Sequence, residues 1–268
     1  MDIKQFVVDA FTNEPFSGNP AAVCLLGELL PAETMQQIAA ENALPETAFL
    51  TRNSDARYNI RWFTPDIEMD LCGHATLATA HVLWHHLDHP QKRIQFSSNS
   101  GVLEVSQKDG RYILDFPARK PTPATLPETI KKSLDVQPVE VLKSRDYILI
   151  YEDEEQIIQL SPDQKVLDDI NLDPGGFAIT APGMECDFVS RFFTPGRQIF
   201  EDPVTGSAHC SLVPYWAEML GKNKLHARQL SDRGGTLYCE NQGDRVLIGG
   251  KARTYSEGTI FVEVAANA

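Results

Sequence analysis

The alternation of hydrophobic and polar residues predicts many short strands and few helices. Runs rich in β-branched and aromatic residues are bounded by Gly, Pro, Asn and Asp, which is typical of strands. In the first half the predicted strands are residues 3–10, 22–26, 47–51, 58–63, 94–96, 102–105 and 112–116. In the second half they are residues 147–151, 176–181, 186–193, 235–240, 246–248 and 259–264. Helical patterns cover residues 30–41, 126–134 and 162–170.

Two further segments are hydrophobic on every side of a helical wheel. They are residues 75–84 and residues 208–220, and the second contains Pro214, which predicts a kink. A helix that is apolar all round must be buried all round. A sheet wrapped around each helix would bury it, and both helices are predicted to begin at a glycine, Gly73 and Gly206.

The chain repeats itself once. R-W-F-T-P at 61–65 matches R-F-F-T-P at 191–195, and G-H-A at 73–75 matches G-S-A at 206–208. Q-F-S at 95–97 matches Q-L-S at 229–231, so the offsets are 130, 133 and 134 in the same order. One long repeat predicts two homologous halves rather than a solenoid. A proline-rich stretch from 117 to 127 predicts the boundary between them.

These patterns together predict an α+β fold. It consists of two pseudo-symmetric domains, residues 1–118 and 119–258, each a curved, mostly antiparallel sheet around a central buried helix.

Composition narrows the function classes. The 268 residues are 42% hydrophobic and 23% charged, which is typical of a globular protein. The net charge of −13 makes nucleic acid an unfavourable partner. No stretch is long and apolar enough to predict a membrane helix, and the N-terminus has no signal-peptide pattern. Five scattered cysteines without a C-x-x-C pair predict neither a disulfide framework nor a metal site, and a cytoplasmic location is expected.

The starts of the two apolar helices are the first candidate binding positions. Unpaired N–H groups and the helix dipole favour an anion there. Cys72 and Gly73 begin one helix, and Thr205, Gly206 and Ser207 begin the other. If pseudo-symmetry brings them together, the cleft between the domains binds a carboxylate. The alternative is two ordinary helix starts with side-chain caps and no ligand.

Three titratable residues are the catalytic candidates. Glu46 stands at the entry to a predicted strand, where desolvation favours a carboxyl group that both takes and returns a proton. Its repeat counterpart is Gly176, so the acid has no twin, although a solvated surface glutamate is the simpler alternative. Asp202 either caps a turn or shares a proton, and His74 is a neutral donor or acceptor or a structural histidine.

Several of these motifs resemble one known family. They are F-S-G-N-P-A-A-V at 16–23, L-P-E-T-A-F at 44–49, F-T-P at 63–65, C-G-H-A-T at 72–76 and E-D-P-V-T-G-S-A at 201–208. In this order they resemble the phenazine-biosynthesis isomerase-like (PhzF-type) family. The resemblance implies the diaminopimelate epimerase-like fold, in which the final strand, here within 259–268, returns to the first domain. It also implies an enzyme without a cofactor, often dimeric, whose proton carrier is Glu46 with His74, Asp202 and Ser207 around the substrate.

The expected function is a cofactor-independent isomerase that acts on a small carboxylate-bearing metabolite. Glu46 moves the proton, Asp202 and His74 hold or relay protons, and Ser207 binds the carboxylate with the Gly73 and Gly206 amides. One alternative is a racemase or epimerase that uses Cys72, although its repeat counterpart is Thr205 and not a second thiol. Another is a non-catalytic binding protein that keeps the fold.

Overall fold

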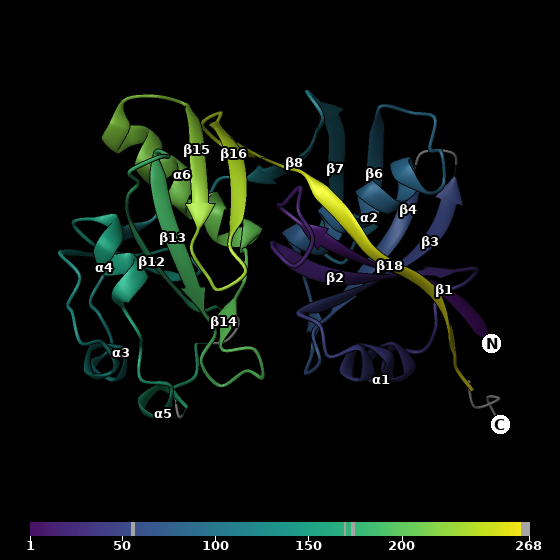
Figure 1. The fold of residues 1–268 in the computed structure, drawn as a ribbon, viewed down its shortest axis with the longest axis horizontal. Coiled ribbons are helices and arrows are strands. Elements are labelled where there is room, and N and C mark those ends of the chain that lie inside the picture. The colour runs from purple at the N-terminus through teal and green to yellow at the C-terminus, as the bar shows by residue number, and fades with distance from the viewer. Residues whose placement is uncertain (55–56, 169, 173–174, 264–268) are drawn as a thin grey trace. The chain divides into compact units, whose positions relative to one another are not determined.

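The computed structural model describes residues 1–54, 57–168, 170–172 and 175–263. The chain forms two compact units (Figure 1). Unit 1 contains Met1–Leu114 and the segment that begins at Gly250, and unit 2 is Asp115–Gly249. The boundaries fall four and nine residues before those expected from the sequence, 118 and 258. The second difference arises because the last strand starts at Ala252 rather than at residue 259.

Unit 1 is a mixed sheet with a helix on each face. Its strands are β1 Asp2–Ala10, β2 Asn19–Leu26, β3 Glu46–Ser54, β4 Arg57–Phe63, β5 Glu68–Met69, β6 Arg93–Ser98, β7 Gly101–Lys108, the first part of β8 Arg111–Pro117, and β18 Ala252–Phe261. Its helices are α1 Ala32–Asn42 and α2 Gly73–His85. Hydrogen bonds give the order β18-β1-β2-β3-β4-β6-β7, with β5 on β4. The pairs β2–β3 and β4–β6 are parallel, and the others in this order are antiparallel.

Helix α2 is the buried helix of unit 1. Every residue from Gly73 to Leu83 is buried, and the helix packs against β1, β2, β3 and β18. This burial agrees with the hydrophobic residues on all its sides. Helix α1 covers the other face of the sheet, where Met35 and Ile38 pack with Phe49 and Phe63.

Unit 2 has the same kinds of elements and more helices. Its strands are β9 Thr122–Pro123, β10 Glu140–Lys143, β11 Tyr147–Ile150, β12 Phe177–Pro182, β13 Phe188–Phe193, β14 Glu201–Asp202, β15 Lys224–Gln229, β16 Gly235–Asn241 and β17 Arg245–Gly250. Its helices are α3 Glu128–Ser133, α4 Glu154–Gln159, α5 Gln164–Leu167 and α6 Gly206–Leu220. The order is β9-β10-β11-β12-β13-β15-β16-β17, with β14 on β13.

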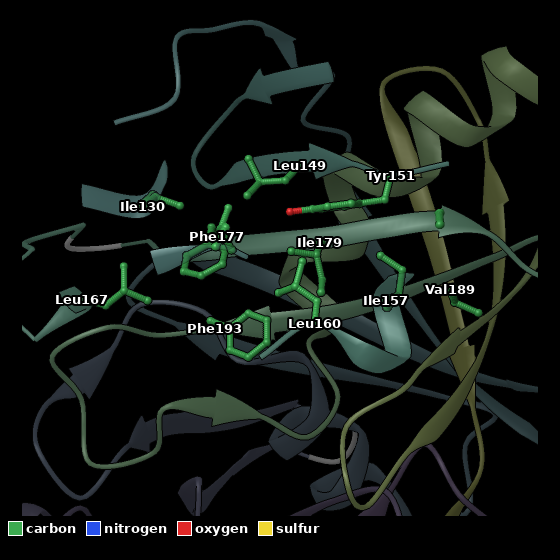
Figure 2. Packing of buried hydrophobic residues seen from close by; sticks show 12 residues of the cluster. Ile130, Leu149, Tyr151, Ile157, Leu160, Leu167, Phe177, Ile179, Val189 and Phe193 are labelled. Carbon is green, nitrogen blue, oxygen red and sulfur yellow. The ribbon is translucent and has the colours of Figure 1, made fainter. Parts of the chain in front are cut away.

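The sheet of unit 2 is also covered on both faces. Phe177 and Ile179 of β12 pack with Ile130, Ile157 and Leu167 of the three short helices (Figure 2). The alternate residue Thr180 accepts a hydrogen bond from the Trp216 indole of α6 at 3.0 Å. Successive side chains of a strand point to opposite faces, so β12 is buried along both faces.

The strands of the two units pair in the same sequence. In each unit a parallel pair, β2–β3 or β11–β12, is followed by an antiparallel pair, β3–β4 or β12–β13. The strand after the central helix then pairs in parallel with β4 or β13. A two-fold relation between the units stays a prediction.

The repeated R-x-F motif has one structural role in both units. Arg61 binds Glu68 with two hydrogen bonds of 2.7 and 2.6 Å, and Arg191 binds Glu201 with two of 2.8 and 2.9 Å. Each guanidinium also lies over the phenylalanine two residues later, 5.2 Å from the Phe63 ring centroid in unit 1. The motif therefore fastens a two-residue strand, β5 or β14, immediately before the central helix.

Pro214 lies inside α6, as the sequence predicts. Proline has no N–H to donate, so the carbonyl of Cys210 one turn earlier loses its helical partner. The backbone N–H of Arg119 donates to that carbonyl at 2.9 Å. The segment after β8 thereby satisfies the group that the proline leaves open.

Some predicted elements differ from the observed ones. The helix predicted over 126–134 is α3, and the one predicted over 162–170 shortens to α5, with residue 169 outside the described residues. The last strand runs from Ala252 to Phe261, and residue 264 of the predicted strand is also outside the described range. Strands β10 and β15 and helix α4 were not predicted. None of the helices in the described ranges is long and apolar enough to cross a membrane.

Candidate active site

A tight turn between α1 and β3 places Glu46. Helix α1 ends at Asn42, and Ala43 takes the left-handed conformation with φ of 49°. The Asn42 side chain donates to the Thr47 hydroxyl at 3.0 Å, which ties the helix end to the strand. Glu46 is the first residue of β3 and pairs with Ala21 of β2. Its position is therefore set by backbone pairing on one side and by the helix end on the other.

Glu46 meets His74 at the start of α2. The Glu46 Oε2 atom lies 3.0 Å from His74 Nε2, and the two side chains are 13% and 4% exposed. The other imidazole nitrogen, Nδ1, lies 3.1 Å from Asn19 Nδ2 and 3.6 Å from Cys72 Sγ. Strands β2 and β3 and the start of α2 thus bring three polar side chains around one buried imidazole.

The neighbours of His74 determine which groups carry charge. Burial lowers the pKa of His74 and the neighbouring Glu46 carboxylate raises it, and the net direction is well above the usual value. Burial, with the Glu46 carboxylate, raises the pKa of Cys72 to about 11. At neutral pH the Cys72 thiol is therefore protonated and a poor base or nucleophile. Because the Asn19 amide can only donate to Nδ1, the proton of the imidazole lies on Nε2 and faces the Glu46 carboxylate.

The same side chains could also ligate a metal ion. Glu46, Cys72 and His74 each offer a ligand atom, and these atoms lie within 4.8 Å of one another. In the described structure the Asn19 amide contacts His74 Nδ1, and the Glu46 carboxylate lies 3.0 Å from Nε2. An ion would have to displace one of these contacts and deprotonate the thiol.

Unit 2 has no acid at the position of Glu46. Thr47 pairs with Phe63 across β3–β4, and Phe177 pairs with Phe193 across β12–β13, so Gly176 takes the place of Glu46. A Cβ on Gly176 would lie 2.3 Å from the Phe193 carbonyl oxygen. Only glycine fits there, so a single glutamate stands at this position of the two units.

The candidates of unit 2 form a separate group. The Thr205 hydroxyl donates to Asp202 Oδ2 at 2.5 Å. The Gln229 amide binds the Thr205 N–H at 2.8 Å and the Asp202 carbonyl at 2.7 Å. Gly206 and Ser207 are the first residues of α6, which the Asp202–Thr205 turn precedes.

Neither central helix is capped by its N-cap side chain. Cys72 and Thr205 occupy the N-cap positions of α2 and α6, but their side chains make no capping hydrogen bond with the helix. By contrast, Asp153 and Asp163 each accept a backbone N–H at the starts of α4 and α5. An uncapped start leaves N–H groups that suit an anion.

The structure thus brings the candidates together in two groups. Unit 1 gathers Glu46, Cys72 and His74 around the start of α2, and unit 2 gathers Asp202 and Thr205 with the start of α6. The sequence did not single out Asn19 or Gln229 as site residues. Each stood in a motif noticed for another reason, F-S-G-N-P and the repeated Q-x-S. Their partners lie 55 and 24 residues away, a distance that no local pattern reveals.

Comparison with known proteins supports one family assignment. The profile of the phenazine biosynthesis-like proteins (PhzC-PhzF) matches residues 8–258. The chain is 48% identical to the uncharacterized isomerase PA2770 of Pseudomonas aeruginosa over 98% of its own length and all of the relative. A crystal structure of a PhzF family protein from Enterococcus faecalis is 43% identical, with a TM-score of 0.91 over 98% of this chain and 100% of that one.

The fold extends to more distant enzymes. A hydroxyproline epimerase from Agrobacterium vitis has a TM-score of 0.63 at 10% identity and covers 97% of this chain and 92% of that one. At that identity only the fold is shared. Three relatives that are 46–48% identical and cover 93–98% of this chain are named isomerases, and the protein is an isomerase. The chain belongs to the phenazine biosynthesis-like (PhzC-PhzF) protein family.

Proposed function

We propose that the protein shifts a proton within a small carboxylate-bearing metabolite, with Glu46 as both acid and base and without a cofactor. The observation that supports it most is the Glu46–His74 contact of 3.0 Å between largely buried side chains. A carboxylate held beside a buried imidazole is oriented and largely shielded from water, which suits a general base.

The reaction needs no oxidant. The Glu46 carboxylate takes a proton from carbon, and the C–H electron pair moves into an adjacent unsaturated or carbonyl group. The protonated Glu46 then returns the proton to another carbon of the same molecule, and the double bond shifts. One C–H bond breaks and one forms. The absence of an acid at Gly176 supports transfer by a single group rather than inversion by two.

The remaining candidates have supporting roles in this proposal. Ser207 and the amides of Gly73 and Gly206 bind the substrate carboxylate, because uncapped helix starts favour an anion. Asp202 and His74 hold or relay protons, and His74 also orients the Glu46 carboxylate. Hydrogen bonds aimed at the developing enolate-like charge contribute much of the rate enhancement.

A cysteine-dependent racemase is less well supported. A thiol whose pKa is raised to about 11 is almost entirely protonated at pH 7. The repeat counterpart of Cys72 is Thr205, whose hydroxyl is a far weaker acid than a thiol.

Exchange in D₂O tests the proposal. A panel of cyclic and amino carboxylates is incubated with wild-type protein, Glu46→Gln and the control Glu41→Gln, whose residue is exposed on α1. We expect proton NMR to show deuterium entering one compound with wild type and the control, and at least a hundredfold slower with Glu46→Gln. Full exchange by a folded Glu46→Gln variant would contradict the assignment. Ligand line broadening without any exchange would favour the binding-protein alternative.

A further inference from the structure

Gln229 lies at the end of β15 and is 1% exposed. A buried amide must satisfy its oxygen and its NH₂ group internally. Its Oε1 accepts from the Thr205 backbone N–H at 2.8 Å. Its Nε2 donates to the Asp202 carbonyl at 2.7 Å and to the Thr205 hydroxyl oxygen at 3.1 Å. One side chain therefore holds both ends of the turn that precedes α6.

These partners fix the orientation of the amide. A backbone N–H can only donate and a backbone carbonyl can only accept, so Oε1 must face Thr205 N and Nε2 must face Asp202 O. If the amide were reversed, its NH₂ group would face the Thr205 N–H, a donor against a donor. Its oxygen would face the Asp202 carbonyl, an acceptor against an acceptor. The orientation of Gln229 thus follows from two independent contacts.

The fixed amide also orients the Thr205 hydroxyl. Because Nε2 donates to the hydroxyl oxygen, the hydroxyl proton is free to point elsewhere, and Asp202 Oδ2 lies 2.5 Å away. The hydrogen bonds therefore run in one direction, from Gln229 to Thr205 and from Thr205 to the Asp202 carboxylate. Ser231, two residues after Gln229, donates to the Pro203 carbonyl at 2.8 Å and holds the middle of the same turn.

We infer that Gln229 is a positioning residue for the reaction, acting through the Thr205 hydroxyl to hold the Asp202 carboxylate charged and in one orientation. Its relevance to turnover rests on the proposed function, in which Asp202 handles a proton. The hydrogen bonds from Gln229 through Thr205 to Asp202 do not depend on the proposed function. Gln229 is buried in unit 2 and is proposed to act on the substrate only indirectly, through Thr205 and Asp202.

The repeat offers a matched control. Gln95 is the counterpart of Gln229 in the repeated Q-x-S motif and lies on β6 of unit 1. Gln95→Met changes the same residue type in the same kind of strand without touching the Asp202 turn. Gln229→Met keeps length and neutrality but removes the amide, so it adds no charge beside Asp202.

Carboxyl ¹³C NMR measures the titration of Asp202 directly, with its signal assigned by its loss in Asp202→Asn. A hydrogen bond from a hydroxyl stabilises the charged form, so Thr205→Val is expected to raise the titration midpoint by about one pH unit. Thr205→Ser restores the wild-type midpoint. Gln229→Met shifts the midpoint in the same direction, the double variant Gln229→Met/Thr205→Val shifts it no further than Thr205→Val alone, and Gln95→Met leaves it unchanged.

The pH profile of substrate exchange is the second readout. In Gln229→Met the limb that depends on Asp202 is expected to move upward with the NMR midpoint, whereas a purely structural loss would lower the rate at every pH. An Asp202 midpoint that is the same in wild type, Thr205→Val and Gln229→Met would overturn the inference, as would shifts of the two variants that add. If Glu46→Gln retains exchange, the proposed function fails while the NMR result still decides the inference.

Discussion

Cys72 and Glu46 contact different nitrogens of His74, and their chemical states differ. The Glu46 carboxylate lies 3.0 Å from the Nε2 atom, whereas burial keeps the Cys72 thiol protonated. A base must be deprotonated before it can act. The surroundings of the two candidate bases of unit 1, rather than their distances from the imidazole, thus determine which one can act as a base.

Cys72→Ser is expected to keep activity within about threefold of wild type. Serine is a favourable N-cap residue, so the start of α2 should form normally. The measurement is kcat and kcat/KM for the compound found by exchange, with circular dichroism as the check of folding. A folded variant that loses activity a hundredfold or more would restore the cysteine-dependent racemase as the leading hypothesis.

At the scale of elements, the two repeated arginines differ in the number of elements that they connect. Arg61 binds Glu68 of β5, whereas Arg191 binds Glu201 of β14 and also donates to the carbonyls of Ile157 and Leu160 at 3.1 and 2.6 Å. Those carbonyls lie at the end of α4. Arg191 therefore joins a strand pair to a helix end, a task for which the planar guanidinium with several donors is suited.

Arg191→Lys should destabilise the protein by about 1–3 kcal/mol more than Arg61→Lys, because a lysine cannot replace donors in both directions. Urea unfolding of the two variants and of wild type gives the comparison, since both substitutions keep the charge. Equal losses would mean that the contacts to α4 contribute little.

The sequence predicted the elements whose pattern is local. Both central helices begin at the predicted glycines, because an all-apolar wheel and a preceding turn mark them. Strand β15 was missed because K-L-H-A-R-Q offers only two apolar residues. The first part of β18 was missed because it is a polar, mostly exposed strand paired with a partner some 250 residues away, Val8 with Thr254. Likewise Glu46 was found by its motif, whereas Asn19 and Gln229 needed the fold.

At the scale of the whole molecule, each unit buries a histidine on its central helix. His81 of α2 binds the Tyr112 and Thr254 hydroxyls at 2.8 Å each, and His209 of α6 binds the Thr205 carbonyl at 2.8 Å. Burial lowers the pKa of both to about 4, with the nearby His85 and His86 adding to the effect at His81. Both are neutral in the folded protein and take up a proton more readily when it unfolds.

The sign of the pH dependence follows. Between pH 6.5 and 4 the unfolded chain binds more protons than the folded one, so these histidines lower stability as the pH falls through that window. The expected loss between pH 8 and pH 5 is on the order of 2 kcal/mol for each histidine. Urea unfolding at both pH values measures it, and His81→Gln should reduce the pH-dependent loss by about one histidine's share. An unchanged slope in that variant would contradict this account.

The path of the chain through unit 1 has a consequence for biosynthesis. The chain leaves unit 1 after Leu114 and returns only at Gly250, where β18 pairs along the whole of β1. A ribosome adding roughly 5–20 residues per second would emit β18 on the order of ten seconds after β8. Unit 2 is continuous and can fold as it emerges, whereas β1 waits with one edge unpaired until the last strand arrives. The older half of the nascent chain is thus the last to be completed, and a truncated message that lacks only the final strand would yield a protein whose first unit cannot close its sheet.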